Sequence, residues 1–170
     1  FDYAKISQNF VEYRKLAEEQ ADYLMGKSDS ELSYESERAI ENFKREAQAR
    51  NLKAKSQQYM IMLKSLVNGA AKSASYQLNE LSWGYVTMAE LKGDLERASR
   101  WSDRSLELFV SPANLDTKAN LLYRMGMRKE AIKLEKKAIK TGKKMSTNTS
   151  ILAESLKRMK KRLPITFAVN

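Results

Sequence analysis

The chain contains neither cysteine nor histidine. Without cysteine it has no disulfide, no thiolate nucleophile and no cysteine-ligated metal, and without histidine it lacks the commonest general base and the commonest metal ligand. We therefore expect no catalytic residue, no metal and no cofactor, and a protein that is not an enzyme. The lack of cysteine indicates no compartment, because cytosolic and envelope proteins can both do without it.

Glycine and proline are scarce, with 6 and 2 of 170 residues, and no stretch approaches the roughly 18 apolar residues of a membrane span. Helix-forming residues are plentiful, and 42% of the chain is apolar, enough for one sizeable core. This composition predicts an all-α protein. The chain begins with Phe1 rather than Met and its first residues lack the layout of a signal peptide, so we expect a mature form or an excised part of a longer protein.

Positive charge is concentrated near the C-terminus. Residues 118–162 hold 15 lysines and arginines against three acidic residues, a net charge of +12, whereas the rest of the chain sums to −2. Such a stretch can attract nucleic acid, anionic lipid or an acidic protein, although lysine-rich helix exteriors are also an ordinary solvated surface.

Residues 1–77 form an N-terminal helical region of about three predicted helices. Apolar residues at helical spacing predict a first helix from Tyr3 to about Met25, and Ser28 with Glu31 has the spacing of a capping box that starts a second helix, to about Arg50. These helices are either degenerate repeats or a separate bundle.

The third predicted helix of this region contains Met60 and Met62 and ends near Asn68 and Gly69, where a left-handed cap is expected. We expect both methionines to fill the core rather than to form an adaptable binding patch. Residues 70–76 form either a loop or the first turn of the next helix.

Residues 78–142 contain the same helix-turn-helix unit twice. Gly93, Ala98 and Ser105 are matched 33 residues later by Gly126, Ala131 and Ala138. The expected helices cover about 79–91, 94–108 with Asp94 as the cap, 114–125 and 127–140, and Pro112 lies in the break between the units. A period near 33 residues is typical of stacked helical hairpins, which usually bind partners.

Residues 143–163 are predicted to hold a capping helix, over about 148–162, whose apolar side covers the last repeat and whose basic side faces outward. Pro164 ends this helix. The tail, 164–170, is apolar and β-prone, and either packs on the body or frays.

The second unit resembles a tetratricopeptide (TPR) repeat in its sequence from Leu121 to Ile132, with Ala131 and Ala138 as the small residues that allow close helix packing. The first unit resembles the family through Trp83, Gly93 and Ala98, but has Ser105 where alanine is usual. The resemblance implies antiparallel helical hairpins stacked as a short TPR-like α-solenoid.

The segments 78–83 and 113–123 are also similar to the helical region that follows a thioredoxin-like domain in some bacterial envelope proteins. No C-x-x-C motif is present, so no redox activity can be transferred to this chain. Localisation stays unknown, with the bacterial cell envelope or periplasm slightly favoured over the cytoplasm.

The resemblance implies a non-enzymatic protein–protein interaction module, a scaffold or adaptor whose first helix in each unit lines a groove for a peptide or helix of an unidentified partner. Transferred to this chain, the partner-binding residues are Ser82, Val86, Glu90, Asp116, Asn120, Tyr123 and Arg124.

The charged residues allow two alternative functions. The basic C-terminal helices could bind nucleic acid or another anionic surface, although the sequence has no recognition-helix motif and no aromatic platform among the basic residues. Paired carboxylates could serve a hydrolase, either Glu18 with Asp22 or Glu37 with Glu41, but each pair has helical spacing among compensating charges.

Overall fold

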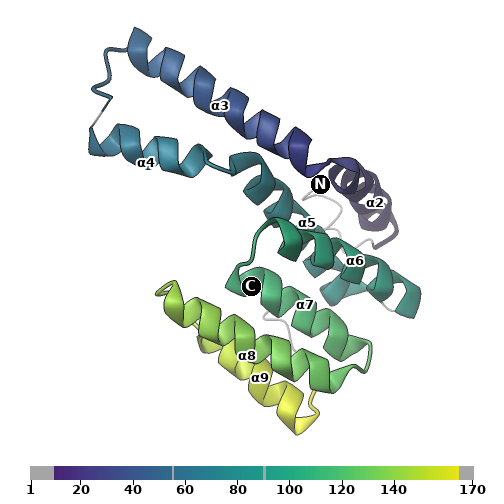
Figure 1. Cartoon of the computed structure of the whole chain (residues 1–170). Helices are drawn as coiled ribbons and strands as arrows, with labels where there is room; N and C mark the ends of the chain where they lie inside the picture. The colour runs from purple at the N-terminus through teal and green to yellow at the C-terminus, as the bar shows by residue number, and fades with distance from the viewer. Residues whose placement is uncertain (1–9, 55, 90, 165–170) are drawn as a thin grey trace.

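The computed structural model describes residues 10–54, 56–89 and 91–164. In these ranges every regular element is an α-helix, which confirms the all-α prediction (Figure 1). The predicted start of the first helix at Tyr3 and most of the tail, 165–170, lie outside the described residues. The helices are α2 (Phe10–Gly26), α3 (Asp29–Ala49), α4 (Gln57–Leu66), α5 (Gly69–Met88), α6 (Lys92–Leu108), α7 (Pro112–Arg124), α8 (Arg128–Lys144) and α9 (Ser150–Lys161).

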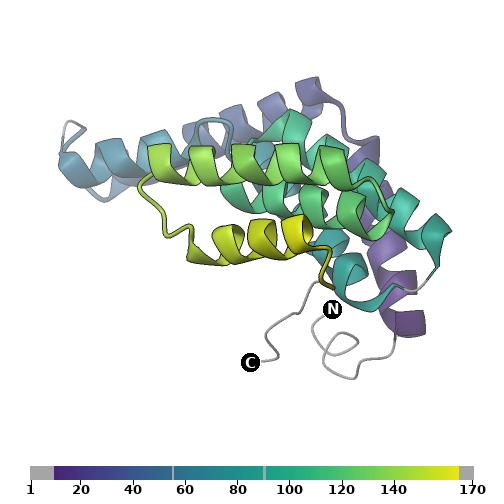
Figure 2. The ribbon, with the colours of Figure 1, turned by 90° about the horizontal axis from the view of Figure 1, so that it is seen from below.

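From α5 onward, neighbouring helices pack in chain order, whereas α2 and α3 both pack on α5. The closest pairs are α5 with α6 and α7 with α8; α6 also packs on α7, and α9 packs on α8. The helices thus succeed one another from α3 and α4 at one end to α8 and α9 at the other (Figure 1), and a view from below places α8 and α9 in front of the rest (Figure 2).

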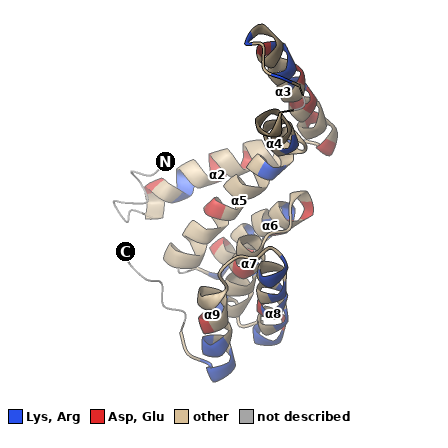
Figure 3. Ribbon diagram, turned by 90° about the vertical axis from the view of Figure 1, so that its left-hand side faces the viewer, with Lys and Arg blue, Asp and Glu red and all other residues tan. Residues whose placement is uncertain are grey.

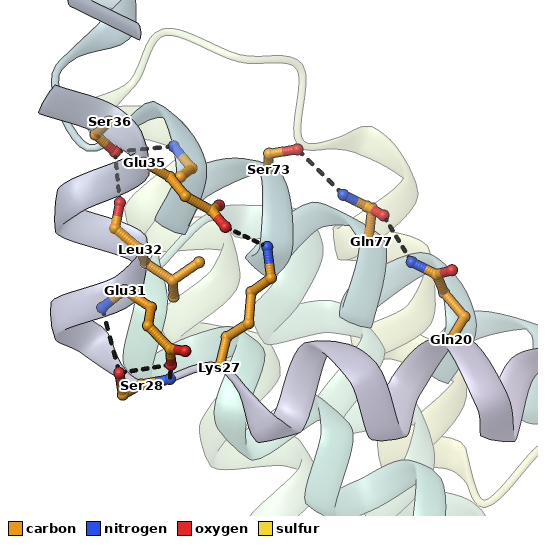
Figure 4. A network of polar contacts seen from close by, with 10 residues as sticks. Gln20, Lys27, Ser28, Glu31, Leu32, Glu35, Ser36, Ser73 and Gln77 are labelled. Atoms are coloured by element: carbon orange, nitrogen blue, oxygen red, sulfur yellow. Dashed lines mark hydrogen bonds and ion pairs between the residues drawn. The ribbon is translucent and has the colours of Figure 1, made fainter. Parts of the chain in front are cut away.

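Local signals set the first helix boundaries as predicted. The Ser28 side chain accepts a hydrogen bond from the Glu31 N–H at 3.2 Å while the Glu31 carboxylate accepts one from the Ser28 N–H at 2.7 Å, so the capping box is confirmed (Figure 4). Asn68 adopts the left-handed conformation, with φ of 55°, also as expected. Asn68 directly precedes α5, and residues 70–76 belong to this helix rather than to a loop.

The corner between α2, α3 and α5 is held by polar contacts (Figure 4). The Ser36 hydroxyl accepts a hydrogen bond from the Ala70 N–H at 3.1 Å, which joins α3 to the first turn of α5. Gln20 donates to Gln77 at 3.1 Å, which joins α2 to α5. Both contacts lie within residues 1–77, and α5 continues across the predicted boundary at residue 78 without a break.

An aromatic cluster forms the centre of the larger core. Tyr13 is fully buried and donates a hydrogen bond to the Leu81 carbonyl at 3.0 Å. Tyr85 lies between Phe10 and Trp101, with ring-centroid distances of 5.2 and 5.0 Å. Trp101 is buried. The core thus joins α2, α5 and α6.

The repeated small residues occupy matching places. Ala98 and Ser105 of α6, and Ala131 and Ala138 of α8, have no exposed surface. Ser105 differs from alanine for a reason that the sequence alone does not show: the buried Asn114 amide donates to Ser105 Oγ at 2.6 Å and to Ser75 Oγ at 2.8 Å. The hydroxyl belongs to a buried polar network between α5, α6 and α7, where each polar atom needs a partner.

Four predicted details of the repeats are wrong. Asp94 does not cap α6: it lies inside the first turn, buried and 3.3 Å from the guanidinium of Arg14 on α2, because its side chain faces the core. Gly93 is also inside α6, whereas Gly126 makes the turn with φ of 82°. Pro112 begins α7 after the Ser111 cap, where a proline without an N–H is tolerated. Finally, α8 continues past 141 and 142 to Lys144.

Candidate partner-binding surface

The structure places the predicted groove residues of the first unit in the core. Ser82 and Val86 on α5 are fully buried. The Ser82 hydroxyl donates to the Leu78 carbonyl at 2.7 Å and the Ala98 carbonyl at 3.1 Å, so it joins α5 to α6. Glu90 lies outside the described residues. Ser82 and Val86 are therefore packing residues, and their assignment to an open groove wall is corrected.

This correction has a clear physical reason. In a simple stack one side of α5 would face solvent, but here α2 and α3 return and pack on it while α6 and α7 cover its other sides. The phenol of Tyr13 reaches the α5 backbone. Because neighbouring helices cover them completely, Ser82 and Val86 do not line a groove.

Asp116 and Asn120 of α7 form the wall of a buried carboxyl site rather than of an open groove. Asn120 is fully buried, and its amide donates to the Asp116 carboxylate at 2.9 Å. Glu135 of α8 is fully buried, and no described N–H or O–H donates to its carboxylate oxygens. Burial and then the charge of Asp116 raise the pKa of Glu135 to about 9, and burial raises the pKa of Asp116.

A pKa of about 9 leaves Glu135 protonated at neutral pH. A neutral Glu135 satisfies the buried site without a counter-ion. Its burial leaves no access for a partner or substrate.

Tyr123 and Arg124 hold helices together. Tyr123 donates to the Leu163 carbonyl at 2.8 Å, near the end of α9. The Arg124 guanidinium donates to the carbonyls of Tyr85 at 3.1 Å, Val86 at 2.6 Å and Ala89, which lie at the C-terminal end of α5. The last carbonyls of a helix lack most of their helical partners, and a cation there is favourable. Arg124 thus joins the two units.

An exposed apolar surface lies elsewhere, on α4. Met60 and Met62 are 52% and 49% exposed, so the expectation that they fill the core is wrong. Ile61 is 62% exposed and Val67 is 47% exposed, and α4 has no buried residue. Helix α4 is short and packs on α3 and α5 alone among the closer helix pairs. These two neighbours leave several of its apolar residues exposed. The term α3–α4 surface is used for Leu52, Tyr59, Met60, Ile61, Met62 and Val67.

A hollow lies between α3 and α4, lined in part by Leu52, Tyr59 and Met62 of this surface. Phe43 and Tyr59 line it with ring centroids 5.1 Å apart and their ring planes tilted by 39°, together with Ala47, Leu52 and Met62, while Glu46 and Arg50 supply charge. In the sequence, the α3–α4 surface is indicated by the unbroken apolar run from Tyr59 to Leu63. Five consecutive apolar residues point to all sides of a helix, so one buried face cannot cover all of them.

The second exposed feature is basic. Lysines and arginines gather on α8 and at the end of α9, whereas acidic residues are more frequent on α3 (Figure 3). The exposed side chains of α8 from 129 to 144 are all charged: Glu130 and seven lysines. The predicted concentration of charge therefore corresponds to a real face of one helix.

The carboxylates considered for hydrolysis are placed as surface charges. Glu18 pairs with Arg14 at 2.9 Å and with Arg97, and it lines a shallow polar hollow with Asp22. Glu37 and Glu41 are exposed on α3. Across the described part of the chain, no three His, Cys, Asp or Glu side chains are grouped to hold a metal ion.

Comparison of the chain with known protein families, with curated proteins and with solved structures finds no match. Among the residues that the structure describes, no helix combines the length and apolar character that crossing a membrane requires. The two exposed surfaces, apolar at α3 and α4 and basic on α8, are therefore the candidate binding surfaces of the described chain.

Proposed function

We propose that the chain is a short TPR-like α-solenoid that acts as a non-enzymatic protein–protein interaction module and binds an amphipathic helix of a partner protein on the α3–α4 surface. The exposure of Met60, Ile61 and Met62 on a helix with no buried residue carries this proposal. The matching burial of Ala98 with Ala131, and of Ser105 with Ala138, supports the repeat arrangement.

The remaining helices of the described chain show why the α3–α4 surface is open. Helices α2 and α7 cover the pair α5 and α6, and α9 covers part of the pair α7 and α8. By contrast, α3 and α4 pack closely only on each other and on α5. The packing rule of helical stacks is that each hairpin buries its apolar side against a neighbour. A partner helix would supply that neighbour.

The chemistry of the surface fits a helix. Apolar residues spaced by three and four on a partner helix would insert beside α4 and into the hollow at Phe43 and Tyr59, as in other helix-in-groove complexes. Methionine side chains adapt to different shapes, and Met60 and Met62 flank Ile61. Glu46 and Arg50 at the rim would set the orientation through charge.

A pull-down with matched variants tests the proposal. The double variant Ile61→Asp/Met62→Asp places charge on α4 at exposed positions, and the control Ile151→Asp does so on α9, where Ile151 is 77% exposed. We expect wild type and the control to retain the same discrete protein through about 0.5 M salt, at which charge attraction is screened beyond a few Å. The double variant should lose it.

Cross-linking of the retained protein to the chain identifies the segment in contact, and binding of that segment as a synthetic peptide completes the test. The segment should be an amphipathic helix with a Kd raised at least about tenfold by the double variant, which corresponds to about 1.4 kcal/mol. Thermal unfolding of each variant verifies that the fold is kept. Retention of the same protein by the double variant, or no retained protein with the wild type, would refute the proposal.

A further inference from the structure

The exposed lysines of α8 form one continuous face. At 100° per residue they fall within an arc of about 120°, and the first and last are about 22 Å apart along the helix axis. The name α8 lysine face is used for Lys129, Lys133, Lys136, Lys137, Lys140, Lys143 and Lys144. Its opposite side, with Ala131, Glu135 and Ala138, is buried on α7 and α9.

This face has no internal counter-ion. The ion pairs of the described residues lie on other helices, and none includes a lysine of α8, whereas the lysine of α7, Lys118, pairs with Asp103 at 2.6 Å. Glu135, the one other acidic residue of α8 besides Glu130, is buried beneath the helix. Seven like charges at spacings of three and four residues repel one another, at a cost to stability that a bound polyanion would remove.

The shape and chemistry of the face distinguish between polyanions. A helix adsorbed on a membrane inserts apolar side chains below the headgroups, but every exposed residue of α8 between 129 and 144 is charged. Single-stranded nucleic acid is usually held by aromatic stacking, and α8 has no aromatic residue. A duplex presents a row of phosphates without a need for stacking, and its major groove admits an α-helix.

We propose that the α8 lysine face binds the phosphate backbone of double-stranded nucleic acid without sequence preference. Lysine ammonium groups contact phosphates as point charges, and each such contact releases a counter-ion and adds about −0.9 to the slope of log affinity against log salt. The face lies at the opposite end of the molecule from α3 and α4 (Figure 1), so a duplex and a partner helix can bind together.

Fluorescence anisotropy with a labelled 20-base-pair duplex tests this proposal. The variant Lys133→Glu/Lys136→Glu/Lys140→Glu reverses the middle of the face, and Lys44→Glu/Lys53→Glu/Lys64→Glu changes the net charge by the same amount at exposed positions on α3, α4 and their connection. At 50 mM salt we expect the first variant to weaken binding by about tenfold or more, and to reduce the salt slope by about three. The second should bind nearly as wild type does.

Three results would overturn the proposal. The first is no binding of the wild type to the duplex at 50 mM salt. The second is equal weakening by the two variants, which would assign the effect to net charge rather than to α8. The third is strong binding to vesicles with 30% phosphatidylserine without binding to the duplex, which would assign the face to a membrane surface. Circular dichroism of both variants verifies that loss of binding is not loss of the fold.

Discussion

Glu135 is the residue at which charge and packing conflict most directly. Its carboxyl lies fully buried between α7 and α8 beside Asp116, and burial together with that charge raises its pKa to about 9. An unfolded chain releases the same proton near pH 4.3. The folded state therefore binds one more proton than the unfolded state across the interval, and the free energy of unfolding falls as pH rises through it.

We expect Glu135→Gln to increase the free energy of unfolding at pH 8 and above and to flatten its decrease between about pH 4.5 and pH 9. The amide keeps the shape of the protonated acid and has no proton to lose. The free energy of unfolding of the variant relative to wild type therefore grows toward pH 9, by about 1.4 kcal/mol for each pH unit. Urea unfolding at several pH values measures this. The control Glu130→Gln, at an exposed position of the same helix, should keep the wild-type slope. Parallel slopes for Glu135→Gln and wild type would show that Glu135 is ionised at neutral pH.

At the scale of elements, α5 organises the fold because other helices pack around it. Close approach of α2 requires a residue without a side chain at Gly84, since a Cβ at that position would overlap the phenol of Tyr13. Gly93, in the first turn of α6, has open space around the position of a Cβ and no positive φ. The missing side chain is thus required for helix packing at Gly84 but not at Gly93.

We expect Gly84→Ala to lower the free energy of unfolding by about 1–3 kcal/mol, the usual cost of overpacking a core. Gly93→Ala should raise it by about 0.5–1 kcal/mol, because alanine loses less conformational entropy than glycine when a helix forms. Chemical denaturation of both variants under the same conditions measures the difference. A stability of Gly84→Ala at or above that of wild type would mean that α2 does not pack on α5 in solution.

At the scale of the whole molecule, burial is uneven. The largest core joins α2, α5 and α6, and smaller clusters join α7, α8 and α9. At the other end, α4 contributes no buried residue, and it packs only on α3 and the start of α5. Elements with few buried apolar contacts open at a lower free energy than the core.

We expect native-state hydrogen exchange to show the amides of α4 opening well below the global free energy of unfolding, while the central amides of α5 exchange only on global unfolding. Mass spectrometry of exchange at several denaturant concentrations measures both. Binding of a partner helix to the α3–α4 surface should slow exchange in α4 and leave α5 unchanged. Equal protection of α4 and α5 in the free protein would contradict this description.

The sequence by itself determined the elements that depend on neighbouring residues. Composition predicted the all-α fold, the spacing of Ser28 and Glu31 predicted the start of α3, and the helices predicted over 114–125 and 127–140 left Gly126 as the turn before α8. Each of these features depends on local backbone and capping chemistry, which residues a few positions apart supply. The concentration of positive charge is likewise a property of the sequence of α8.

Only the tertiary structure decided which apolar and polar residues are covered. Ser82 and Val86 are buried because α2, α6 and α7 pack around α5, and Met60 and Met62 are exposed because no described helix covers their side of α4. Periodicity reports that a helix has an apolar side, but long-range packing selects the neighbour that covers it. The predicted groove residues thus became structural, while the open surface fell on a helix expected in the core.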